Sequence, residues 1–137
     1  FAECSPKLVS LLLEAGADVT LKVAFDFGDG LGLNFETVLG YNTSCSDARA
    51  DVVKMLLDAG ADPNSQDTLF GEAPLHHVVD GDEGVKIGKL LLEYGADPLL
   101  TNTNGETPLD YAKVLSKDQD LIDLLTEATE KALKSST

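Results

Sequence analysis

The stretch Met55-Leu56-Leu57-Asp58-Ala59-Gly60-Ala61-Asp62 occurs three times, with small changes, in this 137-residue chain. Residues 11–18 read Leu-Leu-Leu-Glu-Ala-Gly-Ala-Asp, and residues 90–97 read Leu-Leu-Leu-Glu-Tyr-Gly-Ala-Asp. Recurrence of this kind is typical of proteins in which each unit buries its apolar face only against its neighbours. The chain is therefore predicted to be a stack of repeats.

Each of these stretches is predicted to end a helix. Apolar residues such as Val52, Met55 and Leu56 precede each glycine at the i, i+3, i+4 spacing of one helix face. The glycines are predicted C-caps, because the chain must pass there through a left-handed conformation that glycine adopts without strain. A proline soon follows the second and third glycines, and proline cannot continue a helix.

A second phrase recurs downstream of the first. Residues 71–76 read Gly-Glu-Ala-Pro-Leu-His and residues 105–110 read Gly-Glu-Thr-Pro-Leu-Asp. Proline suits the first position of a helix, where its missing N–H would have no partner. Each unit is thus predicted to consist of a turn, a short helix, a loop, a longer helix and a glycine cap.

Together the two phrases resemble the ankyrin repeat, whose marks are Thr-Pro-Leu-His at the inner helix and Leu-Leu-x-x-Gly-Ala-Asp at the end of the outer helix. The resemblance implies an all-α repeat solenoid, in which helix pairs joined by short β-hairpins stack in chain order. It divides residues 1–137, as a single domain, into a partial first repeat and three further repeats. The predicted repeats are 1–19, 20–62 with an inserted hairpin, 63–97, and a C-terminal capping repeat at 98–137. Because the chain starts within a repeat, we expect it to be a fragment of a longer protein.

The positions of the two recurring phrases predict seven helices. They are expected near residues 6–15, 38–43, 48–59, 74–80, 84–94, 108–115 and 119–133. The second of them lacks the proline of the phrase and carries Gly40 in its interior. A glycine there costs about 1 kcal/mol relative to alanine, so this helix is predicted to be the weakest.

The second repeat contains extra residues within 21–35. Gly16 and Gly60 are 44 residues apart, whereas Gly60 and Gly95 are 35 apart. Apolar residues alternate with polar or small ones on both sides of a Gly-Asp-Gly turn, at Val23, Phe25 and Phe27 before it and at Leu31, Leu33 and Phe35 after it. This pattern predicts an extended β-hairpin at about 22–35 with one apolar face.

The hairpin is predicted to be a contact element, because an isolated two-stranded ribbon is only marginally stable in water. We expect Leu33 and Phe35 to pack on the first two repeats. Phe25 or Phe27, near the tip, is expected to be exposed to a partner.

Composition excludes several classes of protein. An apolar content of 43% excludes a disordered chain, and no apolar run approaches the roughly 18 residues of a membrane helix. Cys4 and Cys45 match no metal-ligand spacing, so free thiols are expected, in the cytoplasm or the nucleus. We expect a monomer.

The net charge of −14, from 24 acidic and 10 basic residues, argues against direct nucleic-acid binding. One interpretation of this charge is solubility alone. The other is attraction of a basic partner, because like charges gathered in a groove concentrate their field there.

The resemblance implies that partners bind the concave face, formed by hairpin tips and inner helices. Glu36, Glu72 and Glu106 precede the three inner-helix phrases, so they are predicted to form one solvent-exposed column, with Asp80 on the same side. The alternative is that each glutamate only favours the start of its helix, through the helix dipole. The other predicted partner-binding residues are Asp26, Asp29, Asp67, Phe25, Phe27 and Phe70. For Phe70 an exposed anchor and a cover for the core are equally open.

The favoured function is therefore a protein-binding module for a basic protein or peptide segment. An escort chaperone for a ribosomal protein or histone, or an adaptor, would be examples. The alternative is a scaffold or regulatory segment of a larger protein, docking by apolar contacts of the first half-repeat.

No catalytic residue, cofactor or metal site is predicted. Cys45 has no histidine in phase to activate it, and the acids of 26–36 do not match the positions of a calcium loop. His76 stands where the family's usual histidine bonds the turn backbone, so a structural role is expected. His77 is in phase with Tyr41 and Tyr111, and all three are expected to pack between inner helices or to contact a partner.

Overall fold

The computed structural model describes residues 6–26, 30, 32–45 and 47–135. Within these ranges the chain forms helices, a two-stranded antiparallel sheet and one 3₁₀ turn. In chain order the elements are α1 (Pro6–Glu14), β1 (Lys22–Asp26), β2 (Leu33–Thr37), α2 (Val38–Ser44), α3 (Ala50–Asp58), α4 (Pro74–His77), the 3₁₀ turn η1 (Val78–Asp80), α5 (Gly84–Glu93), α6 (Pro108–Leu115) and α7 (Gln119–Ser135).

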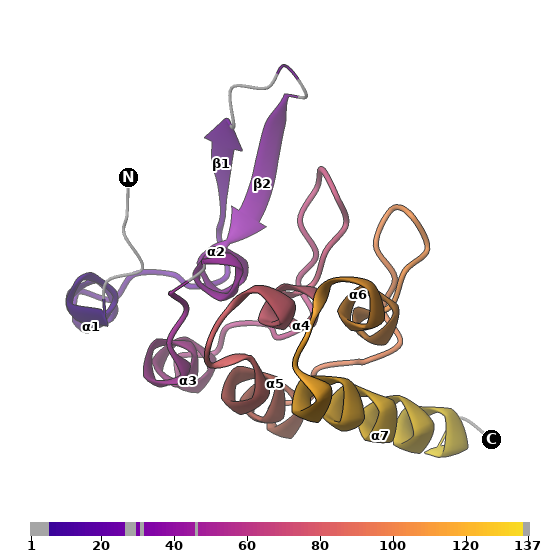
Figure 1. The fold of residues 1–137 in the computed structure, drawn as a ribbon. Helices are drawn as coiled ribbons and strands as arrows, with labels where there is room; N and C mark the ends of the chain where they lie inside the picture. Colours follow the sequence, from indigo (N-terminus) through magenta and orange to yellow (C-terminus); the bar gives the residue numbers. More distant parts are fainter. Residues whose placement is uncertain (1–5, 27–29, 31, 46, 136–137) are drawn as a thin grey trace.

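The helices form two rows that run in chain order. Figure 1 shows α2, α4 and α6 in one row, called the inner helices below, and α1, α3, α5 and α7 in the other, called the outer helices. Each helix contacts the next member of its own row. This arrangement confirms the predicted repeat solenoid, and each predicted helix is present. The largest difference is at the helix predicted for 74–80, where α4 ends at His77 and the 3₁₀ turn η1 continues to Asp80. The start of α3, at Ala50, and the end of α7, at Ser135, each differ by two residues from the prediction.

The core lies between the two rows and continues from repeat to repeat. Its largest fully buried side chains include Leu39, Leu56, Leu75, Leu91 and Leu121. Each buried leucine contributes about 1.5–3 kcal/mol relative to an exposed one. Because these leucines belong to one buried cluster that runs through successive repeats, stability is distributed along the stack.

The predicted glycine caps are confirmed at the ends of the outer helices. Gly60 has a φ of 97°, which places it in the left-handed region. Its N–H donates to the carbonyl of Leu57, and the N–H of Ala61 donates to that of Leu56, both at 3.0 Å. These are the two bonds of a Schellman motif.

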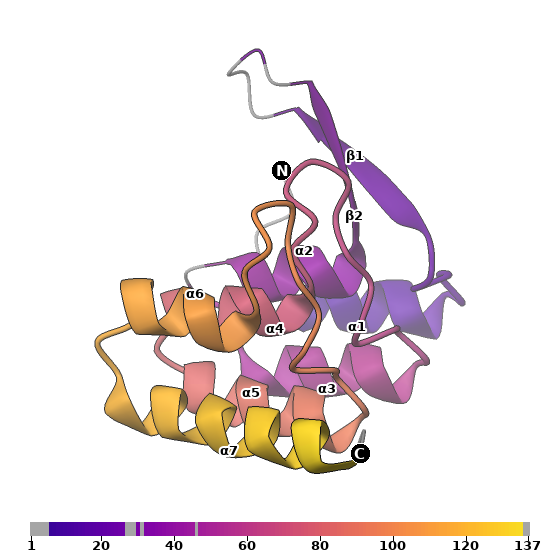
Figure 2. The same ribbon diagram turned by 90° about the vertical axis from the view of Figure 1, so that its right-hand side faces the viewer.

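Three projections extend from the inner row on one side of the stack (Figure 1). Two are the loops at residues 59–73 and 94–107, called the first and second finger below. The third is the β1–β2 hairpin, whose strands reach beyond the tips of both fingers (Figure 2).

The predicted hairpin pairs residues 23–27 with residues 31–35, which places Val23 opposite Phe35, and the observed register differs from this by one residue. Ala24 pairs with Phe35, and Val23 pairs with Glu36. Residues directly opposite in an antiparallel pair share a face, so Phe35 lies on the opposite face from Val23. The prediction of a single apolar face is therefore wrong, because a shift of one residue moves a strand's side chains to the other face.

Polar contacts, rather than apolar packing, attach β2 to the first finger. The side-chain carbonyl of Asn34 accepts the N–H of Leu69 at 3.0 Å, and Asn34 is buried. The N–H of Phe35 donates to Oγ1 of Thr68, whose own N–H donates to the carbonyl of Phe35.

The expectation that Leu33 and Phe35 pack on the stack is also wrong. Their exposed fractions are 53% and 41%. The pairing of β2 with the finger through its backbone edge leaves these side chains in solvent. Phe27 and the side chain of Phe25 lie outside the described part of the chain.

Cys45, at the C-terminal end of α2, is half-buried and disulfide-bonded. The expectation of free thiols is thus contradicted, and it no longer supports a reducing compartment. The other cysteine of the sequence, Cys4, lies outside the described residues. Among the described helices, none is long and apolar enough to cross a membrane.

Candidate functional site

The three glutamates predicted to form an exposed column do occupy equivalent positions. Glu36, Glu72 and Glu106 each directly precede the N-cap residue of α2, α4 or α6. Their exposure differs from the prediction. Glu36 is 5% exposed, and the other two are half-buried. The predicted solvent-exposed column is therefore wrong at Glu36.

The burial of Glu36 depends on Gly40, one turn into α2. A Cβ atom placed on Gly40 would lie 2.8 Å from Cγ of Glu36, closer than side-chain carbons approach. The missing side chain thus provides the space in which the glutamate folds back over the helix. This close approach also accounts for a glycine in the interior of α2, which the sequence alone marked only as a weakness.

Glu106 is held within the second finger. Its Oε1 accepts hydrogen bonds from the side-chain amides of Asn102 and Asn104, at 3.2 and 3.4 Å. The carboxylate therefore stabilises the finger, and any partner would have to compete with these bonds.

Asp67, predicted as a partner contact, is also a loop-forming residue. It is 6% exposed, and its Oδ1 accepts the N–H groups of Phe70 and Gly71 at 2.7 and 3.0 Å. These two bonds fix the tip of the first finger. Phe70, at that tip, is 40% exposed and does not cover the core.

The remaining predicted contact residues are less defined. Asp26, at the end of β1, is exposed. Asp29 lies outside the described residues, and so does the side chain of Asp80. Their roles as partner contacts stay predictions.

The structure brings together a buried group that the sequence did not reveal. Glu36 at the end of β2, Asp67 in the first finger and His77 in α4 each offer a ligand atom, and these atoms lie within 4.8 Å of one another. We call these three residues the Glu36–Asp67–His77 cluster. All three are buried. Because the residues come from three segments, their proximity could not be read from the sequence.

His77 donates hydrogen bonds from both ring nitrogens. Its Nε2 lies 3.2 Å from Oε2 of Glu72. Its Nδ1 lies 3.2 Å from Oγ1 of Thr43, whose hydroxyl hydrogen is already donated to the carbonyl of Gly40 at 2.8 Å. Both acceptors therefore require a proton on the ring, and this network assigns His77 the imidazolium form.

The carboxylates around His77 all raise its pKa. Burial lowers the pKa of His77, but the hydrogen bond to Glu72 and the charges of Glu36, Glu72 and Asp67 outweigh burial. The pKa is raised above its usual value of 6.5. In return, for Glu72, burial raises the pKa, but the bond and charge of His77 and a hydrogen bond from Tyr111 lower it below its usual range.

The pKa of Glu36 is raised, whereas that of Glu72 is lowered. Burial raises the pKa of Glu36 most, the charge of His77 lowers it, and the charges of Asp67 and Glu72 raise it, so that the pKa rises overall from 4.5 to about 7. Near neutral pH the carboxyl group is thus divided between its protonated and ionised forms.

His76 has the structural role expected of it. The N–H of Ala73 donates to Nδ1 of His76 at 3.1 Å, so the ring proton is on Nε2, which donates to the carbonyl of Glu106 at 2.9 Å. Burial lowers the pKa of His76. The neutral ring therefore links the start of α4 to the second finger.

The stacked helix pairs, glycine caps and fingers match a known family. The model describing ankyrin repeats, in three copies, matches residues 43–135, which is more than half of the chain. The chain belongs to the ankyrin-repeat family. Ankyrin repeats are general protein–protein interaction modules and are typically non-enzymatic.

Relatives with this repeat are diverse. The chain is 32% identical over 111 residues to the ankyrin repeat protein R664 of Acanthamoeba polyphaga mimivirus, an alignment that covers 81% of the chain and 64% of the relative. It is 33% identical over 111 residues to the nuclear factor NF-kappa-B p105 subunit of Gallus gallus, covering 81% of the chain and 10% of that protein. It is 42% identical over 64 residues to the 2-5A-dependent ribonuclease of Homo sapiens, covering 47% of the chain and 8% of that protein. The chain therefore spans less than two-thirds of the length of each.

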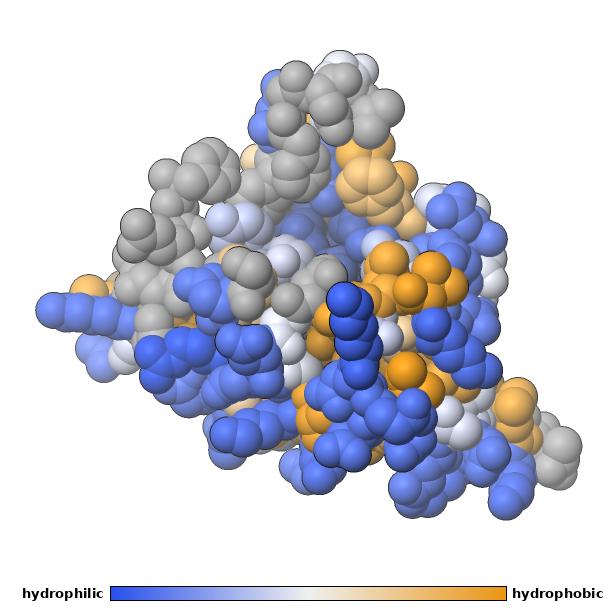
Figure 3. All heavy atoms as spheres, in the orientation of Figure 1, coloured by the Kyte–Doolittle hydropathy of each residue, from blue (hydrophilic) through white to orange (hydrophobic). Residues whose placement is uncertain are grey.

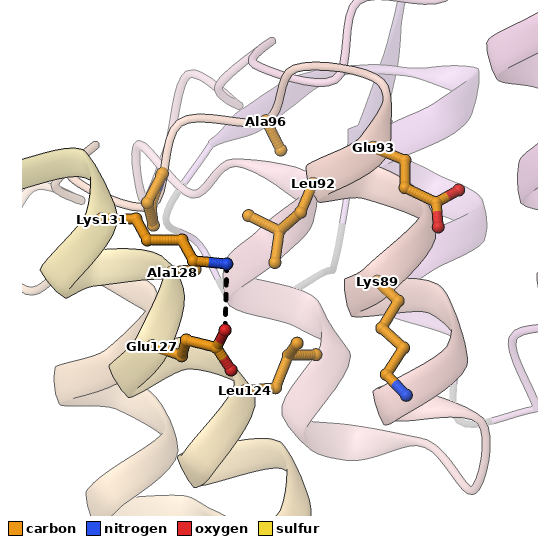
Figure 4. Close-up of a pocket in the computed structure, with 9 residues that line it drawn as sticks. Lys89, Leu92, Glu93, Ala96, Leu124, Glu127, Ala128 and Lys131 are labelled. Carbon is orange, nitrogen blue, oxygen red and sulfur yellow. Dashed lines mark ion pairs between the residues drawn. The ribbon is translucent and has the colours of Figure 1, made fainter. Parts of the chain in front are cut away.

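The surface of this ankyrin-repeat stack has two further features, its distribution of apolar residues and a groove. The face in Figure 3 is mostly hydrophilic, with apolar residues gathered in small patches. A groove of about 450 Å³ lies between α5 and α7. As Figure 4 shows, it combines apolar Leu92 and Leu124 with an exposed ion pair between Glu127 and Lys131, whose atoms are 2.9 Å apart. Its lining mixes both signs of charge, so it favours no one class of ligand.

Proposed function

We propose that this chain is a non-catalytic protein-binding module whose partner contacts apolar side chains of the hairpin and the first finger. The proposed contact residues are Leu33, Phe35 and Phe70. They are called the finger contact residues below.

The observation that carries the proposal is the repetition of an exposed phenylalanine. The carbonyl of Phe35 accepts the N–H of Thr68, and the carbonyl of Phe70 accepts the N–H of Thr103, at 3.2 and 2.9 Å. The two phenylalanines thus hold equivalent positions in successive projections. Each is about 40% exposed. Aromatic side chains on a fixed backbone are favoured at protein interfaces, because they bury a large area at a small entropic cost.

A second candidate partner is a basic protein or peptide segment. The net charge of −14 favours it, together with the exposed Asp26 and the partial exposure of Glu72 and Glu106. A ribosomal protein or a histone would be an example, with the chain as an escort chaperone or adaptor in the cytoplasm or nucleus. The burial of Glu36 weakens this version, because one of its three column charges is withdrawn from solvent.

A third candidate is docking onto another domain through the first half-repeat. Leu11 and Leu12 of α1 are 54% and 46% exposed. In an ankyrin stack a preceding repeat would cover such leucines, so this face favours a neighbouring domain as the partner.

Capture from a lysate at low and high salt tests these candidates against one another. The wild type would be compared with F35S/F70S, with L11S/L12S, and with V114S as a control at a residue that is 76% exposed. We expect a protein that the wild type, V114S and L11S/L12S retain at both salt concentrations and that F35S/F70S loses. Equal retention by F35S/F70S would contradict the proposal. Loss of the same protein at high salt from every variant would favour a basic partner instead.

A further inference from the structure

We propose that the Glu36–Asp67–His77 cluster is a binding site for a transition-metal ion, with Zn²⁺ as the best-fitting ion. The site would join the second repeat to the third, because β2 contributes one ligand, and the first finger and α4 contribute the other two. It shares no residue with the finger contact residues, although Asp67 accepts the N–H of Phe70.

The first support is the distance between the donor atoms. One oxygen of Glu36, one of Asp67 and one ring nitrogen of His77 lie within 4.8 Å of one another. Ligands at about 2.0–2.2 Å from Zn²⁺ are separated by about 3–4 Å in a tetrahedral site. Small side-chain rotations would therefore bring the three atoms to coordination distance, with water as the fourth ligand.

The second support concerns the surroundings of the Glu36 carboxyl group. Its side chain is 7% exposed, and the nearest cationic group is Nδ1 of His77, 3.9 Å from Oε1. Among the described residues no group donates a hydrogen bond to either oxygen. Burying an ionised carboxylate without hydrogen-bond donors costs free energy, and a bound cation would offset that cost.

The third support is the orientation of His77. Nε2 donates to Glu72 at 3.2 Å, while Nδ1 faces Glu36. Histidines that bind metals through one ring nitrogen usually donate the other N–H to a carboxylate or carbonyl, which fixes the ring. Glu72 would supply that carboxylate. Binding would displace the proton of Nδ1 to solvent and end its bond to Thr43, whose hydroxyl keeps its bond to Gly40.

The donor set selects the type of ion. One imidazole nitrogen and two carboxylate oxygens suit Zn²⁺ and neighbouring transition metals, whereas Ca²⁺ and Mg²⁺ prefer oxygen ligands alone. Charge agrees with this choice. Three carboxyl groups, those of Glu36, Asp67 and Glu72, face one imidazole, so acidic groups outnumber basic ones here, and a divalent ion would offset this excess.

Calorimetric titration of the metal-free chain with Zn²⁺ tests the proposal. The chain is first treated with a chelator, which is then removed. We expect one saturable site per chain, a higher melting temperature with Zn²⁺, and a visible absorption band when Co²⁺ replaces Zn²⁺. E36Q and H77Q should each weaken binding at least about tenfold, because each loses a ligand. E130Q, on the exposed side of α7, should bind as the wild type does.

E36Q is the deciding variant, because it keeps the size of the side chain and should fold even if H77Q does not. Absence of a saturable site in the wild type would overturn the proposal and leave the cluster as a proton-binding group. Equal binding by the wild type and E36Q would also overturn it, because the ion would then lie on exposed acids elsewhere.

Discussion

Gly40 and Glu36 are in direct contact, and the absence of a side chain on Gly40 allows the carboxyl group of Glu36 to be buried. A Cβ on Gly40 would lie 2.8 Å from Cγ and 2.9 Å from Oε1 of Glu36. The glutamate in turn faces His77, one repeat further along the stack, with Oε1 and Nδ1 separated by 3.9 Å. A backbone position in α2 is therefore coupled to the contact between the second and third repeats.

This contact gives the first prediction. Alanine is favoured over glycine in a helix by about 1 kcal/mol, so G40A would stabilise α2 if nothing opposed it. Because Glu36 occupies the space, we expect G40A instead to destabilise the protein by about 1–3 kcal/mol. In an E36A background the same change should be neutral or stabilising. Urea unfolding of the four proteins measures the coupling, and additive effects would show that the two residues act independently.

The second prediction concerns pH. The folded-state pKa of Glu36 is raised from 4.5 to about 7, so the folded protein keeps a proton that the unfolded chain loses. This contribution to stability is complete below about pH 4.5 and is lost as the pH rises through about 7. It amounts to about 3 kcal/mol. The raised pKa of His77 extends the loss above pH 6.5, while the lowered pKa of Glu72 acts only at acid pH.

E36Q should remove most of this dependence. In the metal-free protein we expect the free energy of unfolding of the wild type to fall between about pH 5 and pH 7, and that of E36Q to stay nearly constant. Denaturant titrations with a chelator present measure both. Parallel curves for the two proteins would mean that Glu36 titrates near its ordinary value and is not buried.

The third prediction concerns the core between the rows. Leu75 of α4 is 1% exposed, so L75A should cost about 2–5 kcal/mol through lost burial and the cavity that remains. V114A, at a side chain that is 76% exposed, should change stability by no more than about 0.5 kcal/mol. Similar losses in both variants would place the core elsewhere.

Local sequence was sufficient for the helices and their ends. The apolar spacing before Gly60 and the proline at Pro108 are signals within one element, and the structure has a glycine cap and a helix start at these positions. Both signals act through backbone geometry that does not depend on the rest of the fold.

Long-range relationships could not be predicted in this way. The alternation of apolar residues did not predict the hairpin register. It also gave no sign that Asn34 and Phe35 of β2 bond the first finger, more than 30 residues away in sequence. The exposure of Glu36 depends on the space above Gly40. His77 of α4 lies close to Glu36 of β2 and to Asp67 of the first finger, and no signal within one element indicated this. In each case the deciding neighbour is distant in sequence or is an absent side chain.

The proposal that the finger contact residues bind the partner is tested most directly by measuring affinity and its salt dependence for a partner captured by the wild type. F35S/F70S would be compared with E72Q/E106Q, which removes the two partly exposed column charges. We expect F35S/F70S to dissociate faster, with affinity lowered by about thirtyfold or more, because exposed aromatic anchors carry much of the energy of an interface. E72Q/E106Q should change affinity little. The opposite result, in which E72Q/E106Q slows association and flattens the salt dependence while F35S/F70S binds normally, would contradict the account and support recognition of a basic segment.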